Sequence, residues 1–370
     1  MFDPRFTQMA HNLIQYSVHL QPGEKVLIHN IGERTELAQA LIDAAYEAGG
    51  QPFLQLENPR LQRHLVQHAT EEQLRLQAEH ELAFMKEMDA YIGIRASSNS
   101  YEMGGISAEQ MKRYSSIFRP VTDQRCAHTK WCVMRYPNEA MAQAAGKNTE
   151  EFADFYFDVC CLDYSKMAAA MEHLVALMNR TDKVRLVAPG TDLTFSIKDI
   201  PAVPCSGQCN IPDGEVFTAP VKDSVNGVIS YNTPSLRDGF TFENIVLTFK
   251  DGKIVDAKAN DTARINEIFD IDEGARYVGE FAIGVNPYVL HPMKDTLFDE
   301  KIAGSIHFTP GCCYEGEAEN GNYSALHWDL VLIQRPEYGG GEMWFDDVLV
   351  RKDGLFVLPE LACLNPENLK

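Results

Sequence analysis

The residues with the clearest capacity for chemistry lie in segment 305–334, SIHFTPGCCYEGEAENGNYSALHWDLVLIQ. His327 and Asp329 stand two positions apart in an apolar run that predicts a strand, so we expect their side chains on one face. His307 lies in a second short apolar run, and Tyr314 follows it in a glycine-containing loop. Imidazole, carboxylate and phenol groups brought together are typical ligands of zinc or a related transition ion. Each residue alone is more often structural, so the prediction of a metal site depends on the group.

Three glutamates precede these residues in settings that distinguish them from the many solvated carboxylates. Glu215 follows the turn-forming run Pro-Asp-Gly at 212–214, and Glu280 follows a glycine. Each of the two is followed by apolar residues typical of a strand. A carboxylate in that position must face solvent or pair with a cation, which makes both candidate metal ligands. Glu300 stands seven residues before His307 and is a third candidate.

The first half of the chain alternates short apolar strands with amphipathic helices. Strands are expected at 25–30, 51–57, 90–96 and 130–137, and helices at 35–50, from Thr70, after Ser107 and from 149 to 178. This alternation predicts an α/β domain with a parallel open sheet and helices on both faces. The chain has no G-x-G-x-x-G and no G-K-[ST] motif, which argues against a nucleotide site in that sheet.

The second half is dominated by strands. The Asp-Gly dipeptides at 251–252 and 353–354 are strong signals for two-residue hairpin turns. One helix is expected over 261–269. With 370 residues the chain is long enough for two cores. We therefore expect an α/β open-sheet domain over 1–182 and a mainly antiparallel β (α+β) domain over 183–370, which carries the metal-binding residues.

Composition restricts the class of protein. The formal net charge of −20 argues against nucleic-acid binding, because phosphate contacts require a basic surface. No apolar run is as long as a membrane span, and the N-terminal residues lack the apolar core of a signal peptide. Nine cysteines, with adjacent pairs at 160–161 and 312–313, do not suggest a disulfide framework. These features predict a cytoplasmic protein in a reducing compartment.

The motifs NIPDGEVFTAP, GEFAIGVNP, the DEK-to-histidine segment with its downstream tyrosine, and HWD resemble the thermophilic metallo-aminopeptidase family of the AmpS, PepS and aminopeptidase T type. The order of the motifs and the chain length agree over essentially the whole chain. The resemblance implies a homodimer with sites facing an enclosed interior and two divalent metal ions (Zn²⁺, Co²⁺ or Mn²⁺) per chain. The implied metal ligands are Glu215, Glu280, Glu300, His307, Tyr314, His327 and Asp329. The resemblance also implies catalytic roles for Glu215, Glu300 and Tyr314, and the cysteine pair before Tyr314 departs from the small residues expected there.

The implied activity is hydrolysis of N-terminal residues from peptides by a metal-activated water. A second glutamate would carry the proton of that water to the leaving amine. One alternative is a mononuclear iron ring-cleaving dioxygenase of the 2,5-dihydroxypyridine type, which needs only His307, His327 and Asp329. Another is a non-enzymatic binding protein on the same fold. The presence of Glu215 and Glu280 favours the hydrolase.

Overall fold

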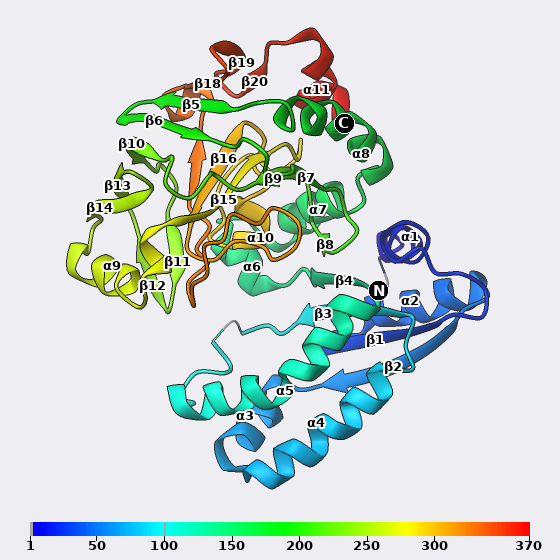
Figure 1. The fold of residues 1–370 in the computed structure, drawn as a ribbon. Coiled ribbons are helices and arrows are strands. Elements are labelled where there is room, and N and C mark those ends of the chain that lie inside the picture. The colour runs from blue at the N-terminus through cyan, green and yellow to red at the C-terminus, as the bar shows by residue number, and fades with distance from the viewer. Residues whose placement is uncertain (1–2, 100) are drawn as a thin grey trace. The chain divides into compact units, whose positions relative to one another are not determined.

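The chain folds into two compact units in the computed structural model, which describes residues 3–99 and 101–370 (Figure 1). Unit 1 comprises Met1–Cys161 and Gly207–Ile211, and unit 2 comprises Leu162–Ser206 and Pro212–Lys370. The units therefore divide one helix earlier than the boundary expected after residue 182. The reason is that helix α8 (Tyr164–Met178) contacts strands of unit 2.

Unit 1 contains a five-stranded parallel sheet in the order β2-β1-β3-β4-β8. Its strands are β1 (Lys25–Gly32), β2 (Gln51–Glu57), β3 (Ala90–Ala96), β4 (Lys130–Arg135) and β8 (Asn210–Ile211). Its helices are α1 (Arg5–Asn12), η1 (Leu13–Ser17), α2 (Glu36–Glu47), α3 (Pro59–His68), α4 (Glu71–Met85), α5 (Ala108–His128), α6 (Glu139–Ala144) and α7 (Thr149–Cys160). The expected α/β domain with a parallel sheet is confirmed. Strand β8 was not predicted, because two residues carry no periodicity.

Both faces of this sheet are covered. Leu27 and Tyr91 are buried on one face, in a cluster with Met85 at the end of α4. Val26 and Ile28 point to the other face and are fully buried as well. Burial on both sides is typical of a parallel sheet between helical layers.

The helix starts follow the expected capping residues. Thr70 accepts a hydrogen bond from the backbone N–H of Gln73, and Ser107 forms a capping box with Gln110. The single helix expected over 149–178 is wrong. It is interrupted after α7, because the Asp163 carboxylate accepts backbone N–H groups of the next turn and starts α8.

Unit 2 consists mainly of two antiparallel sheets. The larger has the order β14-β13-β10-β6-β5-β18-β19-β20, and the smaller has the order β17-β16-β15-β9-β7. The strands of the larger sheet are β5 (Lys183–Ala188), β6 (Thr191–Ser196), β10 (Asn226–Ser230), β13 (Val246–Lys250), β14 (Lys253–Lys258), β18 (Glu342–Phe345), β19 (Val348–Lys352) and β20 (Leu355–Phe356). Those of the smaller sheet are β7 (Val203–Cys205), β9 (Glu215–Thr218), β15 (Val278–Gly284), β16 (Ser305–Pro310) and β17 (Val331–Ile333). The expected antiparallel β-rich second domain is confirmed.

Short elements connect these sheets. They are the hairpin β11 (Ser235–Arg237) with β12 (Phe240–Phe242), and the helices α9 (Thr262–Phe269), η2 (Gly274–Arg276), α10 (Thr296–Asp299), η3 (Pro336–Tyr338), η4 (Pro359–Leu364) and α11 (Pro366–Leu369). Both expected hairpins and the helix over 261–269 are confirmed. Across the described chain, every helix is too short or too polar to traverse a lipid bilayer.

Aromatic side chains fill the space between the two sheets of unit 2. Phe281 of β15 and Phe308 of β16 contact Phe195 of β6, with ring centroids 4.9 and 5.0 Å away. Successive residues of a strand point to opposite faces. Glu280 and His307, each adjacent to one of these phenylalanines, therefore point away from this core.

Candidate metal centre

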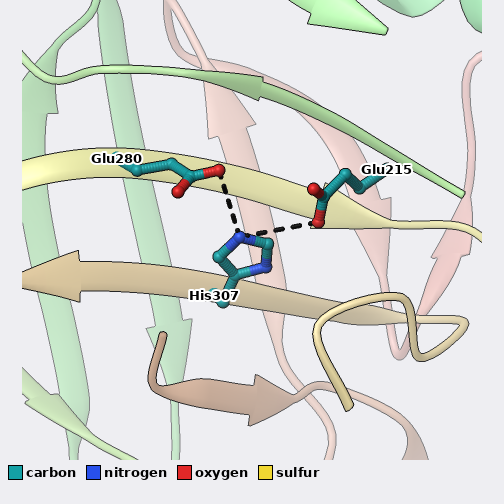
Figure 2. A group of neighbouring side chains, drawn as sticks. All are labelled: Glu215, Glu280 and His307. Carbon is teal, nitrogen blue, oxygen red and sulfur yellow. Dashed lines mark hydrogen bonds and ion pairs between the residues drawn. The ribbon is translucent and has the colours of Figure 1, made fainter. Parts of the chain in front are cut away.

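Strand alternation brings Glu215, Glu280 and His307 to one face of the smaller sheet (Figure 2). Nε2 of His307 lies 3.3 Å from Oε1 of Glu280 and 3.5 Å from Oε2 of Glu215. All three side chains are buried, with relative exposures of 1%, 2% and 5% for His307, Glu280 and Glu215. Two carboxylates and an imidazole therefore converge inside the protein from three strands that are distant in sequence.

A backbone irregularity directs Glu280 into this cluster. The pairing of β15 with β16 shifts register between Val278 and Glu280, at the position of Gly279. A Cβ on Gly279 would lie 2.2 Å from the carbonyl oxygen of Cys312, so only glycine fits this close approach. A bulge of this kind re-aims the neighbouring side chain. The glycine before Glu280 is thus part of the architecture of the site.

His327 and Asp329 complete the cluster at its more exposed end. The expected strand through both is only partly formed, since His327 makes one isolated bridge to Gly311 and β17 starts at Val331. Even so, Nε2 of His327 lies 3.2 Å from Oδ1 of Asp329. It also lies 3.3 Å from Oε2 of Glu280. One oxygen of Glu280 therefore faces each histidine.

The remaining nitrogen of His327 is fixed by the backbone. Nδ1 lies 2.8 Å from the carbonyl oxygen of Cys312. A carbonyl only accepts hydrogen bonds, so Nδ1 carries the proton and Nε2 is directed to the carboxylates. Such a bond to the second nitrogen is the usual way in which a ligating histidine is oriented. Cys312 thus contributes its backbone, which explains how a cysteine can stand where a small residue was expected.

Glu300 joins the cluster from the end of α10 and introduces a residue that sequence reasoning missed. The next residue, Lys301, is 1% exposed. Its Nζ lies 2.5 Å from Oε1 of Glu215, 2.8 Å from Oε1 of Glu300 and 3.4 Å from Oδ1 of Asp213. Asp213 was interpreted only as a turn residue. The sequence did hold one signal for both residues, which is their closeness to predicted ligands. Lys301 directly follows Glu300, and Asp213 stands two residues before Glu215.

Tyr314 lies on the open side of the cluster, in the loop after β16. Its ring contacts His327, with centroids 5.3 Å apart, and Phe217 of β9, at 5.0 Å. The side chain is 48% exposed, whereas His327 is about one-third exposed. A ligand reaching the centre from solvent would meet Tyr314 and His327 first.

The geometry fits divalent ions. Three groups have donor atoms within 4.8 Å of one another: Glu215 with Glu280 and His307; Glu280 with His327 and Asp329; Glu300 with His307 and Asp329. Ligands about 2.1 Å from a tetrahedral zinc ion lie roughly 3.4 Å apart, close to the nitrogen–oxygen separations described above. Oε2 of Glu215 is buried without a hydrogen-bond partner, which points to a ligand at this atom. All the residues expected to bind metal lie in or beside this cluster.

The electrostatics of the metal-free protein show how strongly these groups depend on one another. Although burial opposes it, Glu215 and Glu280 raise the pKa of His307 to about 10. Burial raises the pKa of Glu300 to about 8. Burial also acts against the charge of Lys301, yet Glu215, Glu300 and Asp213 hold its pKa well above the usual value. When no metal is bound, the negative charge of the carboxylates is therefore reduced by protons on His307 and Glu300 and by the ammonium of Lys301.

These shifts predict a pH-dependent stabilisation by metal. Folded-state pKa values raised from 6.5 to about 10 for His307 and from 4.5 to about 8 for Glu300 mean that folding retains protons. The stabilisation that these two groups give the metal-free protein is fully present at low pH. It is lost as the pH rises through the folded-state pKa values of about 8 for Glu300 and about 10 for His307. Metal takes the place of those protons, so its stabilising effect grows with pH. The increase in Tm on adding Zn²⁺ should be larger at about pH 8 than at about pH 6. Equal increases would contradict this proton–metal competition.

The fold has counterparts among solved structures. The chain aligns over 97% of its length with all of wild-type AmpT from Thermus thermophilus, with a TM-score of 0.77 and 23% identity. It aligns over 96% of its length with 98% of the 2,5-dihydroxypyridine dioxygenase of Pseudomonas putida, with a TM-score of 0.63 and 13% identity. At these identities the likeness establishes the fold alone.

The sequence comparisons distinguish the two. The model of the thermophilic metalloprotease family (M29) matches residues 2–339, and the chain belongs to this family. It is 28% identical to aminopeptidase 2 of Geobacillus stearothermophilus, over 95% of each chain. It is 27% identical to aminopeptidase PepS of Streptococcus thermophilus, over 90% of this chain and 92% of that protein. The expected family and a metal-dependent peptidase activity are thereby confirmed, and the family implies binding of divalent metal.

Proposed function

We propose that unit 2 holds two divalent metal ions and removes N-terminal residues from peptides. The observation that carries this proposal is the position of Glu280. Its Oε1 faces His307 and its Oε2 faces His327, each at 3.3 Å. A carboxylate shared by two imidazoles in this way is arranged to bridge two ions, which two-metal hydrolases hold about 3.5–4 Å apart.

Charge supports a pair of ions over a single one. The cluster contains five carboxylates, those of Asp213, Glu215, Glu280, Glu300 and Asp329, and one ammonium, that of Lys301. With both histidines neutral, the net charge is four negative, which two divalent ions would neutralise. One ion would leave two uncompensated charges in a largely buried site, and buried charges are costly unless paired.

The proposed ligands divide by position. Glu215, Glu280 and His307 would hold the inner ion, and Glu280, His327 and Asp329 the outer one, with Glu280 common to both. Glu300 and Tyr314 lie beside these groups and complete the expected set. Zinc, cobalt or manganese would suit this mixture of oxygen and imidazole donors.

In the proposed mechanism the bound ions would lower the pKa of an attacking water and polarise the scissile carbonyl. Glu300 would take the proton of that water and deliver it to the leaving amine. Its side chain is 13% exposed and lies at the edge of the cluster, a position that suits this transfer. Thr309 donates a hydrogen bond to Oδ1 of Asp329 at 2.9 Å and fixes that carboxylate against His327. Glu215 would help to hold the inner ion. The phenol of Tyr314 lies on the exposed side of the cluster, from which we expect the substrate to enter.

A free α-amine is a suitable recognition element for this site. One of the proposed ions, or a carboxylate left outside their coordination, would bind the amine of a peptide N-terminus. A blocked N-terminus offers no such amine. This difference separates an aminopeptidase from a general peptidase.

We expect metal-loaded protein to release the first residue of short peptides and of aminoacyl-amides, but not of the matched N-acetylated compounds. The assay would compare each free compound with its acetylated form at equal concentration, and mass spectrometry would identify the released residue. Hydrolysis of both forms at similar rates would overturn the proposal that the N-terminal amine is recognised.

The dioxygenase remains the second candidate, because the fold resembles that of the Pseudomonas enzyme. Its two-histidine, one-carboxylate site would use only His307, His327 and Asp329. It would leave Glu215 and Glu280 buried beside the iron without a role. Oxygen consumption on hydroxypyridines, with no release of amino acids, would favour this candidate.

We further propose a cytoplasmic homodimer. The resemblance to the metallo-aminopeptidases supports the dimer. The odd number of cysteines, nine, and the adjacent pairs at 160–161 and 312–313 do not match a disulfide framework, which supports a reducing compartment. Light scattering of purified protein would test the dimer directly.

A further inference from the structure

Lys301 occupies a position that is unusual for a lysine. Its ammonium is buried among three carboxylates, at 2.5 Å from Glu215, 2.8 Å from Glu300 and 3.4 Å from Asp213. Three convergent carboxylate oxygens are themselves a typical binding site for a divalent cation. The lysine therefore fills a place in which a metal ion would otherwise be stable.

The backbone prevents the ammonium from leaving easily. The N–H of Lys301 donates to the carbonyl of Phe298, and its own carbonyl accepts the N–H of Asn286. Ile302 forms a bridge to the same Asn286. A Cβ on Gly284 of β15 would lie 2.5 Å from the carbonyl oxygen of Ile302, so the segment packs tightly on the strand. The lysine thus enters the cluster from a fixed position.

The contact with Glu215 has a specific consequence. Oε1 of Glu215 is bound by Lys301, whereas Oε2 has no hydrogen-bond partner and faces His307 at 3.5 Å. With the ammonium on Oε1, the oxygen of Glu215 left without a hydrogen bond, and so most readily offered to a metal, is Oε2. Lys301 therefore determines which oxygen of Glu215 is available.

We propose that Lys301 is a positioning residue that acts as a fixed internal cation of the metal centre. It restricts Glu215 to a single ligand oxygen and keeps metal out of the pocket formed by Asp213, Glu215 and Glu300. This inference rests on the proposed two-metal function. It limits the centre to two ions and keeps Glu300 free to take a proton.

A merely structural lysine and a fixed cation make opposite predictions for Lys301→Met. If the lysine only stabilises the fold, its loss weakens the site and lowers metal binding. If it excludes metal, its loss removes the ammonium from the pocket of three carboxylates, which can then attract a further dication. That ion would engage Glu215 and Glu300, so binding would increase while turnover decreased.

The test is a titration of metal-stripped protein with Zn²⁺ by calorimetry, together with elemental analysis and steady-state kinetics. Unmodified protein should bind two ions per chain and Lys301→Met three. The kcat of Lys301→Met should fall on the order of 10²-fold with little change in KM, because the third ion would engage the proposed general base Glu300. Lys301→Arg, which retains the charge, should bind two ions, and so should the matched control Lys253→Met at an exposed hairpin lysine. A Lys301→Met protein that binds two or fewer ions would overturn the inference.

A measurement on the unmodified protein covers the case in which the variant does not fold. Anomalous diffraction from zinc-loaded crystals should show no ion among Asp213, Glu215 and Glu300, with the Lys301 ammonium still on Oε1 of Glu215. An ion in that pocket, with the lysine displaced, would overturn the inference. Protein that takes up no zinc at all would overturn the proposed function as well, so the two failures are distinguishable.

Discussion

Glu280→Gln is expected to lose at least one of the two metal ions and to lower kcat/KM by about 10³-fold. The amide retains the size of the side chain but removes the charge that lies between His307 and His327. Metal activation contributes several kcal/mol of transition-state stabilisation. At 1.36 kcal/mol for each factor of ten, a loss of about 4 kcal/mol corresponds to roughly three orders of magnitude.

The matched control for this variant is Glu267→Gln, at an exposed glutamate of helix α9 in the same unit. It makes the same chemical change and should leave metal content and activity unchanged. Circular dichroism would show whether both variants are folded. Glu280→Gln protein that is folded, fully metal-loaded and active would contradict the bridging role of Glu280.

Removal of metal by a chelator should abolish peptidase activity completely. Every proposed catalytic step takes place among side chains that converge on the ions, so the stripped protein has no means of activating water at neutral pH. Activity should return on addition of Zn²⁺, Co²⁺ or Mn²⁺ and should not return with Mg²⁺, which prefers oxygen ligands and rarely binds imidazole. Full activity in protein shown by elemental analysis to be free of metal would contradict the metal-dependent mechanism.

The ligand positions were accessible from sequence because they depend on local signals. Glu215 and Glu280 each follow a glycine and precede apolar strand residues, in β9 and β15, and strand periodicity then assigns their faces. His307 was predicted in a strand, and that strand is present as β16. Glu300 and Tyr314 were predicted from their positions before and after His307, and the resemblance to a known family supported both. Residue type and spacing were therefore sufficient to predict side chains that the fold brings together.

Lys301 shows what the sequence could not provide. A lysine after two acidic residues in a polar run is typical of a solvated turn. It is buried only because β9 pairs with β15, which brings Glu215 to it across 86 residues of sequence. The same reason hid Asp213, whose Pro-Asp-Gly context is typical of a turn. Long-range pairing decides which charges meet, and the local signal, a position beside a candidate ligand, does not show that they are buried together.

Secondary structure near the site was also less regular than the sequence suggested. The apolar run after Leu326 predicts a continuous strand, yet only 331–333 pairs as one. His327 instead donates through Nδ1 to the carbonyl of Cys312. Apart from the bridge of His327 to Gly311, residues 327–330 form no regular strand, which the apolar pattern alone does not predict.

The most direct test of the two-metal centre is to measure peptidase activity as metal is returned to the stripped protein. Each sample would be analysed for bound metal and for the rate of release of the N-terminal residue. We predict that activity reaches its maximum at two divalent ions per chain, because Glu280 joins both histidines and the carboxylates exceed what one ion neutralises. A maximum at one ion per chain, with iron preferred and oxygen consumed on hydroxypyridines, would contradict the proposal and favour the dioxygenase.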